Sequence, residues 1–175
     1  MLEKWNKVYN LTAIRNKEQM ISHHILDSLA VVPYLWEGRW LDVGCGAGLP
    51  GLVLAIVKPD NQFTLVDSNS KKTSFVQQAI IELGLQNVVV NCARVEELTT
   101  KVKFDGIISR AFADTAEFIR LTRHLLLKTG QWAAMKGTPE QELMNLPGDV
   151  EVERIIPLKI YGLDAARCLV ILKAK

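Results

Sequence analysis

The chain of 175 residues has few cysteines, no long apolar run and little net charge. Its cysteines, Cys45, Cys92 and Cys168, are odd in number and widely spaced, so they fit neither a disulfide framework nor a zinc site and indicate buried thiols. No apolar segment approaches the roughly 18–20 residues of a membrane-spanning helix. Residues 1–15 also lack the apolar stretch of a signal peptide. We therefore expect a cytoplasmic protein with no metal site and no membrane contact.

The composition is that of an ordinary globular protein, with 49% hydrophobic and 23% charged residues. We expect one domain over residues 1–175, large enough to bury a real core. The net charge of +2 excludes a polycation. Basic residues are nevertheless frequent at both ends of the chain, as a solvated surface or as contacts to a polyanion; they include Lys4, Lys7, Arg15 and Lys17 at one end, and Lys159, Arg167, Lys173 and Lys175 at the other.

Apolar patterns predict strands that alternate with helices. We expect a helical segment over residues 1–39, then an α/β core over residues 40–175. Strands are predicted at residues 40–43, 63–66, 88–90, 105–109 and 131–136, with two further β-like segments at 152–158 and 168–173. Helices are predicted from Pro50 to before Pro59, from Ser70 as cap to Gly84, over about residues 115–127 with Gly130 as the stop, and briefly over 140–146.

This alternation predicts a doubly wound, mostly parallel sheet of seven strands. No long helical pattern separates the last two segments, so we expect them to form an antiparallel hairpin at the C-terminal end.

The most informative stretch is WLDVGCGAGLPG at residues 40–51. A short apolar run ends in Asp42, and glycines follow at alternate positions before a second apolar run. This pattern predicts a strand, a tight turn and a helix. Glycines let such a turn approach a ligand closely, and the helix N-terminus beyond is expected to offer unpaired N–H groups.

Two classes of cofactor fit this turn. Residues 46–51 match the G-x-G-x-x-G fingerprint of dinucleotide-binding proteins. Residues 42–48 match the D-x-G-x-G-x-G turn of methyltransferases that use S-adenosylmethionine. Three features favour the second class: the helical segment before the motif, the position of Asp42 for the amino-acid end of the cofactor, and the terminal antiparallel hairpin typical of class I (Rossmann-like) methyltransferases. A nicotinamide-dependent oxidoreductase remains the alternative.

Asp67 ends the second predicted strand, 23 residues beyond Gly44. Ligands of doubly wound sheets lie beyond the carboxyl ends of the strands. A carboxylate at this edge can accept hydrogen bonds from both hydroxyls of a ribose. The alternative role for Asp67 is a turn residue ahead of the next helix.

Several separate motifs together resemble the GidB/RsmG family, over nearly the whole chain. They are WNKVYNLT at residues 5–12, HILDS at 24–28, the glycine turn with LPG at 49–51, RVEE at 94–97, SRAF at 109–112 and KG at 136–137. The family methylates N7 of a guanine in the 530 loop of small-subunit (16S) ribosomal RNA. Two departures are visible: family members usually carry about one more helix before WNK, and Cys168 follows Arg167 where His is expected.

The resemblance implies roles for particular residues. It places Gly44, Gly46 and Leu49 at the cofactor through the turn and Asp67 at its ribose. It also places Val95 and Glu96 at the adenine and Arg110 where cofactor and substrate meet. Glu96 is otherwise a solvated carboxylate, and Arg110 otherwise belongs to a surface ion pair. Candidates for RNA contacts are Lys7, Arg15, His24, Arg94, Lys136 and Arg167, although His24 also fits a capped helix position.

The reaction implied by the resemblance needs no general base, because N7 of guanine carries no proton. The sequence shows no Ser-His-Asp or paired-carboxylate pattern, so we name no catalytic residue and expect Arg110 to position substrate or cofactor. We expect a monomer whose partner is the small ribosomal subunit or its RNA. Three alternatives remain: a methyltransferase with another target, a nicotinamide oxidoreductase, and an RNA-binding module without cofactor.

Overall fold

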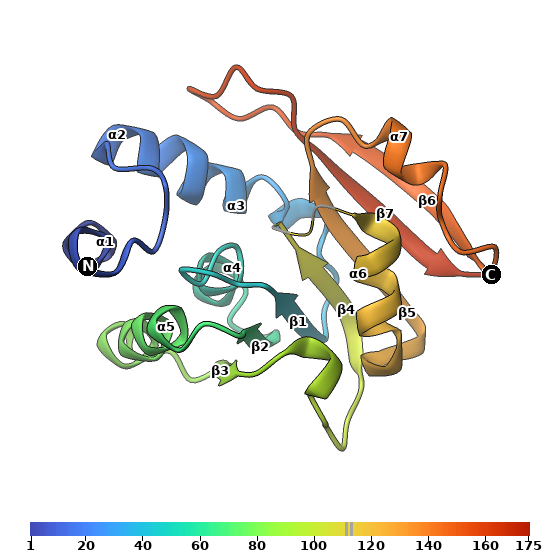
Figure 1. Cartoon of the computed structure of the whole chain (residues 1–175), viewed down its shortest axis with the longest axis horizontal. Helices are drawn as coiled ribbons and strands as arrows, with labels where there is room; N and C mark the ends of the chain where they lie inside the picture. Colours follow the sequence, from blue (N-terminus) through green and yellow to red (C-terminus); the bar gives the residue numbers. More distant parts are fainter. Residues whose placement is uncertain (111, 113) are drawn as a thin grey trace.

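A computed structural model describes residues 1–110, 112 and 114–175; Ala111 of the predicted SRAF motif lies outside the described residues. Within them, seven strands form one sheet in the order β3-β2-β1-β4-β5-β7-β6 (Figure 1). The strands are β1 (Arg39–Val43), β2 (Gln62–Asp67), β3 (Val88–Cys92), β4 (Phe104–Ser109), β5 (Leu126–Lys136), β6 (Val150–Pro157) and β7 (Cys168–Ala174). Strands β1 to β5 pair in parallel, and β7 is antiparallel to both β5 and β6. The mostly parallel sheet and its terminal antiparallel pair are therefore as predicted.

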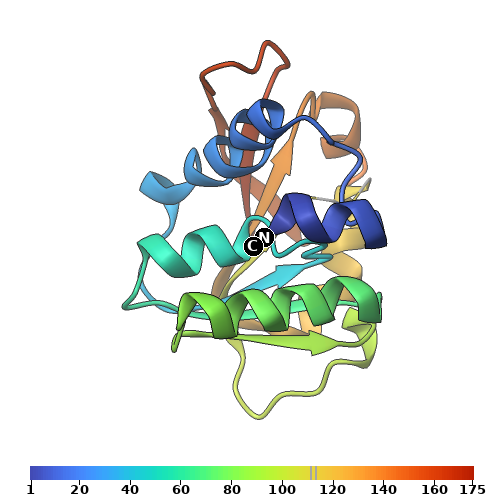
Figure 2. The same ribbon diagram turned by 90° about the vertical axis from the view of Figure 1, so that its left-hand side faces the viewer.

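Helices cover both faces of this sheet. The N-terminal segment contains α1 (Leu2–Tyr9), α2 (Lys17–Met20), the π-helix η1 (Ile21–Leu26), α3 (Asp27–Leu29) and the 3₁₀-turn η2 (Val32–Tyr34). The core adds α4 (Gly51–Val57), α5 (Ser70–Leu83), η3 (Val95–Glu97), α6 (Thr115–Thr122), η4 (Arg123–Leu125) and α7 (Glu140–Leu143). Figure 2 shows the N-terminal helices, α4 and α5 in front of the strands.

Alternate residues of each central strand point to opposite faces of the sheet. Trp40 and Ile108 belong to the apolar cluster beneath α4 and α5, which also takes in Leu11 and Val31 of the N-terminal segment. Neighbouring strand residues such as Leu41 belong to a second cluster beneath α6. Because side chains alternate between two buried faces, nearly every position of these strands is apolar, and the strands appear in the sequence as continuous apolar runs.

The helix predicted over residues 115–127 is shorter in the structure. Helix α6 ends at Thr122, η4 follows, and β5 already begins at Leu126. The buried Trp132 indole donates a hydrogen bond of 2.9 Å to the Thr122 hydroxyl, which joins the helix end to the strand. Gly130 therefore does not stop a helix but lies inside β5, where an added Cβ would be 2.9 Å from the Asp105 carbonyl oxygen.

Two smaller predictions are also wrong. Ser70 does not cap α5, because Asn69 precedes the helix and its side chain accepts from the N–H groups of Lys71 and Lys72. Both residue types are good caps, so the choice depends on where the backbone enters the helix.

The other end of α5 is as predicted, because Gly84 ends the helix with φ of 63°. Cys92 is exposed at the end of β3, whereas Cys45 and Cys168 are buried as expected.

Candidate functional site

Three glycines in the turn that follows β1 have left-handed backbone conformations. Gly44, Gly46 and Gly48 have φ values of 68°, 55° and 79°, which L side chains rarely adopt. At Gly48 an added Cβ would also lie 2.4 Å from Leu52 Cδ1, so a larger residue would displace the Leu52 side chain as well. The N–H groups of Gly44 and Cys45 donate to the Val66 carbonyl oxygen at 2.9 and 3.1 Å, which ties the turn to the end of β2.

Asp67 fixes the same turn from the adjacent strand. Its Oδ2 accepts from the Gly46 N–H at 2.9 Å, and its Oδ1 accepts from the Asn69 N–H at 2.8 Å. A carboxylate has about four acceptor positions, so two backbone donors leave capacity for a ligand. Asp67 is therefore held rigidly by the backbone while it borders open space.

Asp42 lies beneath the turn and is fully buried. Its Oδ2 accepts from the Gly51 N–H at 2.8 Å, and within the described residues its Oδ1 has no hydrogen-bond partner. Burial raises the pKa of Asp42 to about 7, against the effect of the Gly51 hydrogen bond.

Two N–H groups at the start of α4, which we expected to be unpaired, have partners within the chain. Gly51 donates to Asp42, and the Leu52 N–H donates to the Gly48 carbonyl oxygen at 2.7 Å. The turn thus satisfies these two donors internally, because its tight curvature brings a carboxylate and a carbonyl oxygen to them.

Two cavities lie near the glycine turn. One of them, which we call the first cavity, has a volume of about 420 Å³ and lies beyond the carboxyl ends of β1, β2 and β3. Gly44 and Asp67 form part of its wall. Val95 and Glu96, at the start of η3, form another part. The cavity thus combines a glycine backbone, a fixed carboxylate and an apolar side chain. Its remaining lining is Val43, Val66, Ser68, Ala93, Arg94, Phe112, Glu117, Arg120 and Leu121.

The second cavity, of about 280 Å³, lies at the same edge of the sheet beyond β4 and β5. Arg110 follows β4, Lys136 ends β5, and Arg167 precedes β7. Because Lys136 pairs with Cys168 across the antiparallel strands, the start of β7 lies at this edge too. The remaining lining is Ile14, His23, His24, Asp27, Met135 and Gly137.

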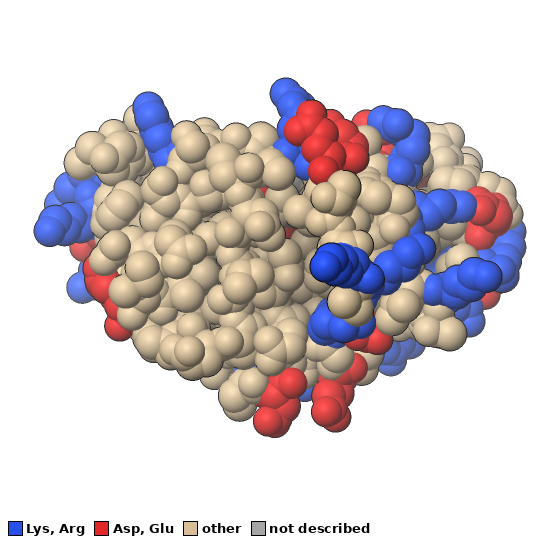
Figure 3. Space-filling model, turned by 90° about the horizontal axis from the view of Figure 1, so that it is seen from below, with Lys and Arg blue, Asp and Glu red and all other residues tan. Residues whose placement is uncertain are grey.

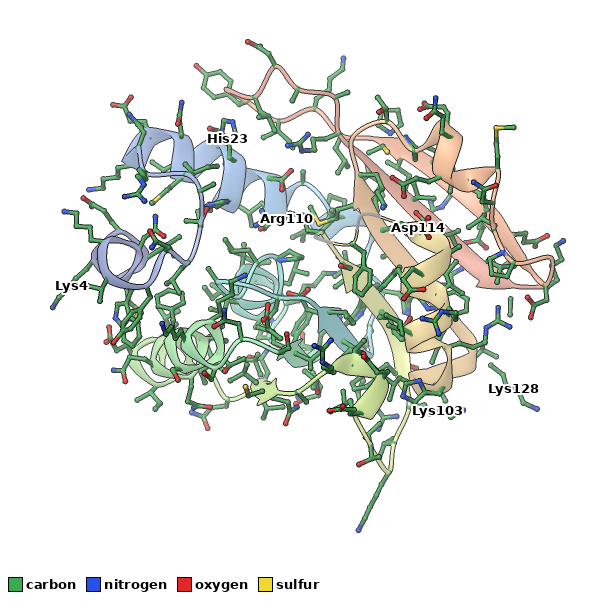
Figure 4. The ribbon with its side chains drawn as sticks, in the orientation of Figure 1. Lys4, His23, Lys103, Arg110, Asp114 and Lys128 are labelled. Carbon is green, nitrogen blue, oxygen red and sulfur yellow. The ribbon has the colours of Figure 1, made fainter. Side chains whose placement is uncertain are left out.

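A buried carboxylate organises the second cavity. The Asp27 side chain is 3% exposed, and its Oδ2 accepts from Arg110 Nη1 at 3.1 Å. Arg110 Nη1 also donates to the His23 carbonyl oxygen, so it bridges the N-terminal helix and the end of β4 (Figure 4). Arg167 Nε lies 3.4 Å from Asp27 Oδ1. The N-terminal segment is thereby bound to the core by charge as well as by apolar contact.

Four of the predicted cofactor residues, Gly44, Asp67, Val95 and Glu96, line the first cavity. Among the described residues, Gly46 and Leu49 are not part of this cavity's lining, and their contact with the cofactor through the turn stays a prediction. The Gly46 N–H donates to Asp67 Oδ2, whereas Leu49 is buried in the core.

Arg110 was also predicted as a cofactor residue but lines the second cavity, because its ion pair with Asp27 directs the guanidinium toward the N-terminal helix.

The RNA candidates are divided among three places. His24, Lys136 and Arg167 line the second cavity, whereas Arg94 lines the first. Lys7 and Arg15 lie elsewhere: Lys7 belongs to α1 and pairs with Glu3 at 3.5 Å, and Arg15 follows α1 and donates to Asn10 at 3.0 Å.

Two of the RNA candidates are largely withdrawn from the surface. The His24 imidazole is buried and hydrogen-bonded to Thr12 at 2.8 Å; burial and the Arg110 charge lower its pKa. The Lys136 side chain is 8% exposed and donates to Glu142 Oε2 and to the Phe112 carbonyl oxygen. Neither is an exposed phosphate contact in this structure.

Sequence reasoning assigned no role to Asp27, although it lies inside the HILDS motif. The available signal was a carboxylate among Ile21, Ile25 and Leu29 at helical spacing. Glu117 and Arg120 of α6 were missed as well; they pair at 2.7 Å on the rim of the first cavity. Periodicity shows that α6 packs on the sheet, but not which cavity its outer residues reach.

The described residues contain no cluster of three or more His, Cys, Asp or Glu suited to a metal ion. Among the same residues, every helix is too short or too polar to cross a membrane.

Comparison with solved structures places the fold among methyltransferases. TrmN from Thermus thermophilus superposes with a TM-score of 0.69 at 19% identity, covering 85% of this chain and 48% of that one. A SAM-dependent methyltransferase from Aquifex aeolicus has a TM-score of 0.65 at 15% identity, covering 95% of this chain and 97% of that one. These similarities confirm the predicted class I methyltransferase fold.

Comparison of sequences shows the family. The chain is 56% identical over 171 residues to ribosomal RNA small subunit methyltransferase G of Laribacter hongkongensis, covering 97% of this chain and 83% of the relative. It is 53% identical over 172 residues to the protein of the same name from Chromobacterium violaceum, covering 97% and 82%. The family model described as GidB, rRNA small subunit methyltransferase G, matches residues 1–170. The glycine turn and the two adjoining cavities thus belong to a member of the rRNA small subunit methyltransferase G family.

Proposed function

We propose that this protein transfers a methyl group from S-adenosylmethionine to N7 of a guanine in the 530 loop of 16S ribosomal RNA. The observation that carries the cofactor is Asp67, fixed by two backbone N–H groups at the edge of the first cavity. The target is supported by the names of the relatives, which share more than half of the sequence. We further propose that the protein acts in the cytoplasm as a monomer without a metal.

The residues of the first cavity suit an adenosine group. Asp67 retains acceptor capacity for ribose hydroxyls, and Val95 supplies an apolar wall for a purine ring. Glu96 lies beside Val95 at the rim, where it meets the polar edge of the base. Asp42 Oδ1, buried without a hydrogen-bond partner among the described residues, is the acceptor for the amino-acid end, directly or through a water.

When bound, the cofactor supplies a sulfonium methyl group: the N7 lone pair forms the new bond while the carbon–sulfur bond breaks and its electron pair remains on sulfur. No proton leaves N7, so the chain's residues contribute by position and electrostatics. Good alignment of reactants is worth roughly 7–11 kcal/mol of the barrier. The second cavity lies beside the first at the same sheet edge and is the place for the base that reacts.

The charge distribution favours recognition of a local RNA shape. N7 lies in the deep, narrow major groove of A-form RNA, so an enzyme reaches it where the base is unpaired or extruded. Figure 3 shows one face of the molecule, on which acidic side chains stand among the basic ones and a broad area carries neither. This face therefore lacks the continuous basic surface that would bind a polyanion without regard to its shape.

The decisive experiment is methyl transfer to small ribosomal subunits from cells that lack this modification, followed by mapping of the labelled base. We expect label at N7 of one guanine in the 530 loop. Label on another nucleotide would reject the proposed target but keep the donor. No transfer to subunits or to free 16S RNA, despite measured S-adenosylhomocysteine binding, would reject the proposed reaction.

A further inference from the structure

The buried carboxylate of Asp27 has one oxygen that the described structure leaves without a hydrogen bond. Oδ2 accepts from Arg110, whereas Oδ1 has only the Arg167 Nε at 3.4 Å and no hydrogen-bond partner. An ionised oxygen removed from water is costly unless a donor satisfies it. Asp27 nevertheless lines the second cavity, although Oδ1 itself exposes less than 1 Å². A ligand in that cavity can supply the missing donor once the side chains around Oδ1, Arg167 among them, shift locally.

The groups around this oxygen limit the ligand's chemistry. Arg110, Arg167 and Lys136 are cations on the cavity wall, and Asp27 is the carboxylate among them. Within the described part of the chain, Arg110 donates through Nη1 alone, so its other N–H groups retain donor capacity. The cavity therefore offers one strong acceptor beside several donors, which matches a ligand edge with N–H groups next to a carbonyl oxygen.

Guanine has such an edge. Its N1–H and N2–H₂ groups are adjacent donors and O6 is the neighbouring acceptor, whereas adenine lacks a proton at N1. With this edge on Asp27, N7 lies on the other edge of the purine and is free to face the first cavity. Methylation leaves a positive charge on the base, and a carboxylate at N1–H stabilises that charge relative to the neutral substrate.

We propose that the second cavity is the guanine pocket and that Asp27 Oδ1 selects the base by accepting from N1–H and N2–H₂. This proposal rests on the proposed function. Asp27 is thus a specificity-determining residue, and Arg110 and Arg167 hold its charge in place. A purely structural ion pair would stabilise the fold but would not distinguish one base from another.

The test compares guanosine with inosine, which lacks only the N2 amino group, at the target position of 16S RNA assembled by ligation and reconstituted into small subunits. Hydrogen bonds to charged groups are worth roughly 1.5–3 kcal/mol, so the wild-type kcat/KM for inosine should be at least ~10-fold lower. Equal values for the two bases in the wild-type enzyme would overturn the proposal without any variant.

The variant Asp27→Asn sharpens the test. The amide oxygen stays on Arg110, which places the NH₂ group at the Oδ1 position, where it opposes the guanine donors. We expect kcat/KM for guanosine to fall at least ~10-fold and the preference over inosine to shrink to about 2-fold or less. Retention of the wild-type preference would overturn the proposal.

Two controls separate this result from loss of structure or of the reaction. Asp149→Asn also breaks an Asp–Arg ion pair, with Arg123, but at the opposite edge of the sheet, so it should keep the wild-type preference. S-adenosylhomocysteine binding by Asp27→Asn should stay within about 3-fold of wild type, because Asp27 does not line the first cavity. Failure of the wild-type enzyme to methylate guanosine would instead remove the proposed function, and the guanine pocket with it.

Discussion

The two cavities lie along one edge of the sheet but are built in different ways. The first is formed by the ends of consecutive parallel strands, and its carboxylate, Asp67, is held by backbone N–H groups. The second gathers residues from four distant segments, and its carboxylate, Asp27, is held by arginine side chains. The cavity that we propose for the cofactor thus depends on backbone geometry, whereas the cavity that we propose for the substrate base depends on side chains that can be exchanged.

Asp67→Ala should have the largest effect on ligand binding in the first cavity. It removes the acceptor for two ribose hydroxyls and releases Gly46, so affinity for S-adenosylhomocysteine should fall about 100-fold, or about 2.7 kcal/mol. Titration calorimetry measures this change. The exposed Asp60 serves as a control through Asp60→Ala, and an unchanged affinity in Asp67→Ala would disprove the ribose contact.

Arg110→Ala should act on the second cavity and spare the first. It removes a partner of the buried Asp27, and since Arg110 is partly exposed and Arg167 remains, we expect a loss of about 2 kcal/mol in the free energy of unfolding. Urea unfolding measures it. The double variant Arg110→Ala, Asp27→Asn should lose less, because no unpaired charge stays buried.

Cofactor affinity distinguishes the two cavities in the same Arg110→Ala variant. S-adenosylhomocysteine binding should stay within about 3-fold of wild type, while turnover falls at least ~10-fold. A large loss of cofactor affinity would instead show that Arg110 contributes to cofactor binding.

Asp42 should make stability fall as pH rises, unlike a carboxylate held by arginine. Its pKa is raised from 3.8 to about 7, so between these values the folded protein binds a proton that the unfolded chain has released. This contribution is present below pH 4 and is lost as pH rises toward 7. Between pH 5 and 6, wild type should lose about 1 kcal/mol more than Asp42→Asn, whose amide keeps the Gly51 hydrogen bond. Parallel pH profiles of the two proteins in chemical unfolding would contradict this.

Glu96→Gln should have the smallest effect, because Glu96 is exposed at the rim of the first cavity. Loss of one charge-assisted contact to the adenine edge should weaken S-adenosylhomocysteine binding about 3-fold, or about 0.7 kcal/mol. The neighbouring Glu97 does not line the cavity, so Glu97→Gln is a matched control. Equal affinities of the two variants would remove Glu96 from the site.

The sequence predicted the positions of site residues best where the path of the backbone alone determines them. Gly44, Asp67 and Val95 lie at or just beyond the carboxyl ends of parallel strands, and these ends share one edge of the sheet, so their convergence could be predicted. Arg110 also follows a strand, but its guanidinium is directed by Asp27, 83 residues away in the chain. The sequence contains no local sign of that contact, so it could place Arg110 only where cofactor and substrate meet and could not predict its partner Asp27.

The amino-acid sequence alone determined the alternation of strands and helices, the glycine turn and the carboxylate that faces it, because these depend on local periodicity and on φ values open to glycine. Only the tertiary structure decided that α6 ends before the predicted residue and that β5 begins soon after it. It also decided that His24 and Lys136 are buried and that Asp27 lies between two arginines. Those outcomes depend on which side chains meet across the sheet edge, and long-range pairing of charges in a low-dielectric interior leaves no periodic signal in the chain.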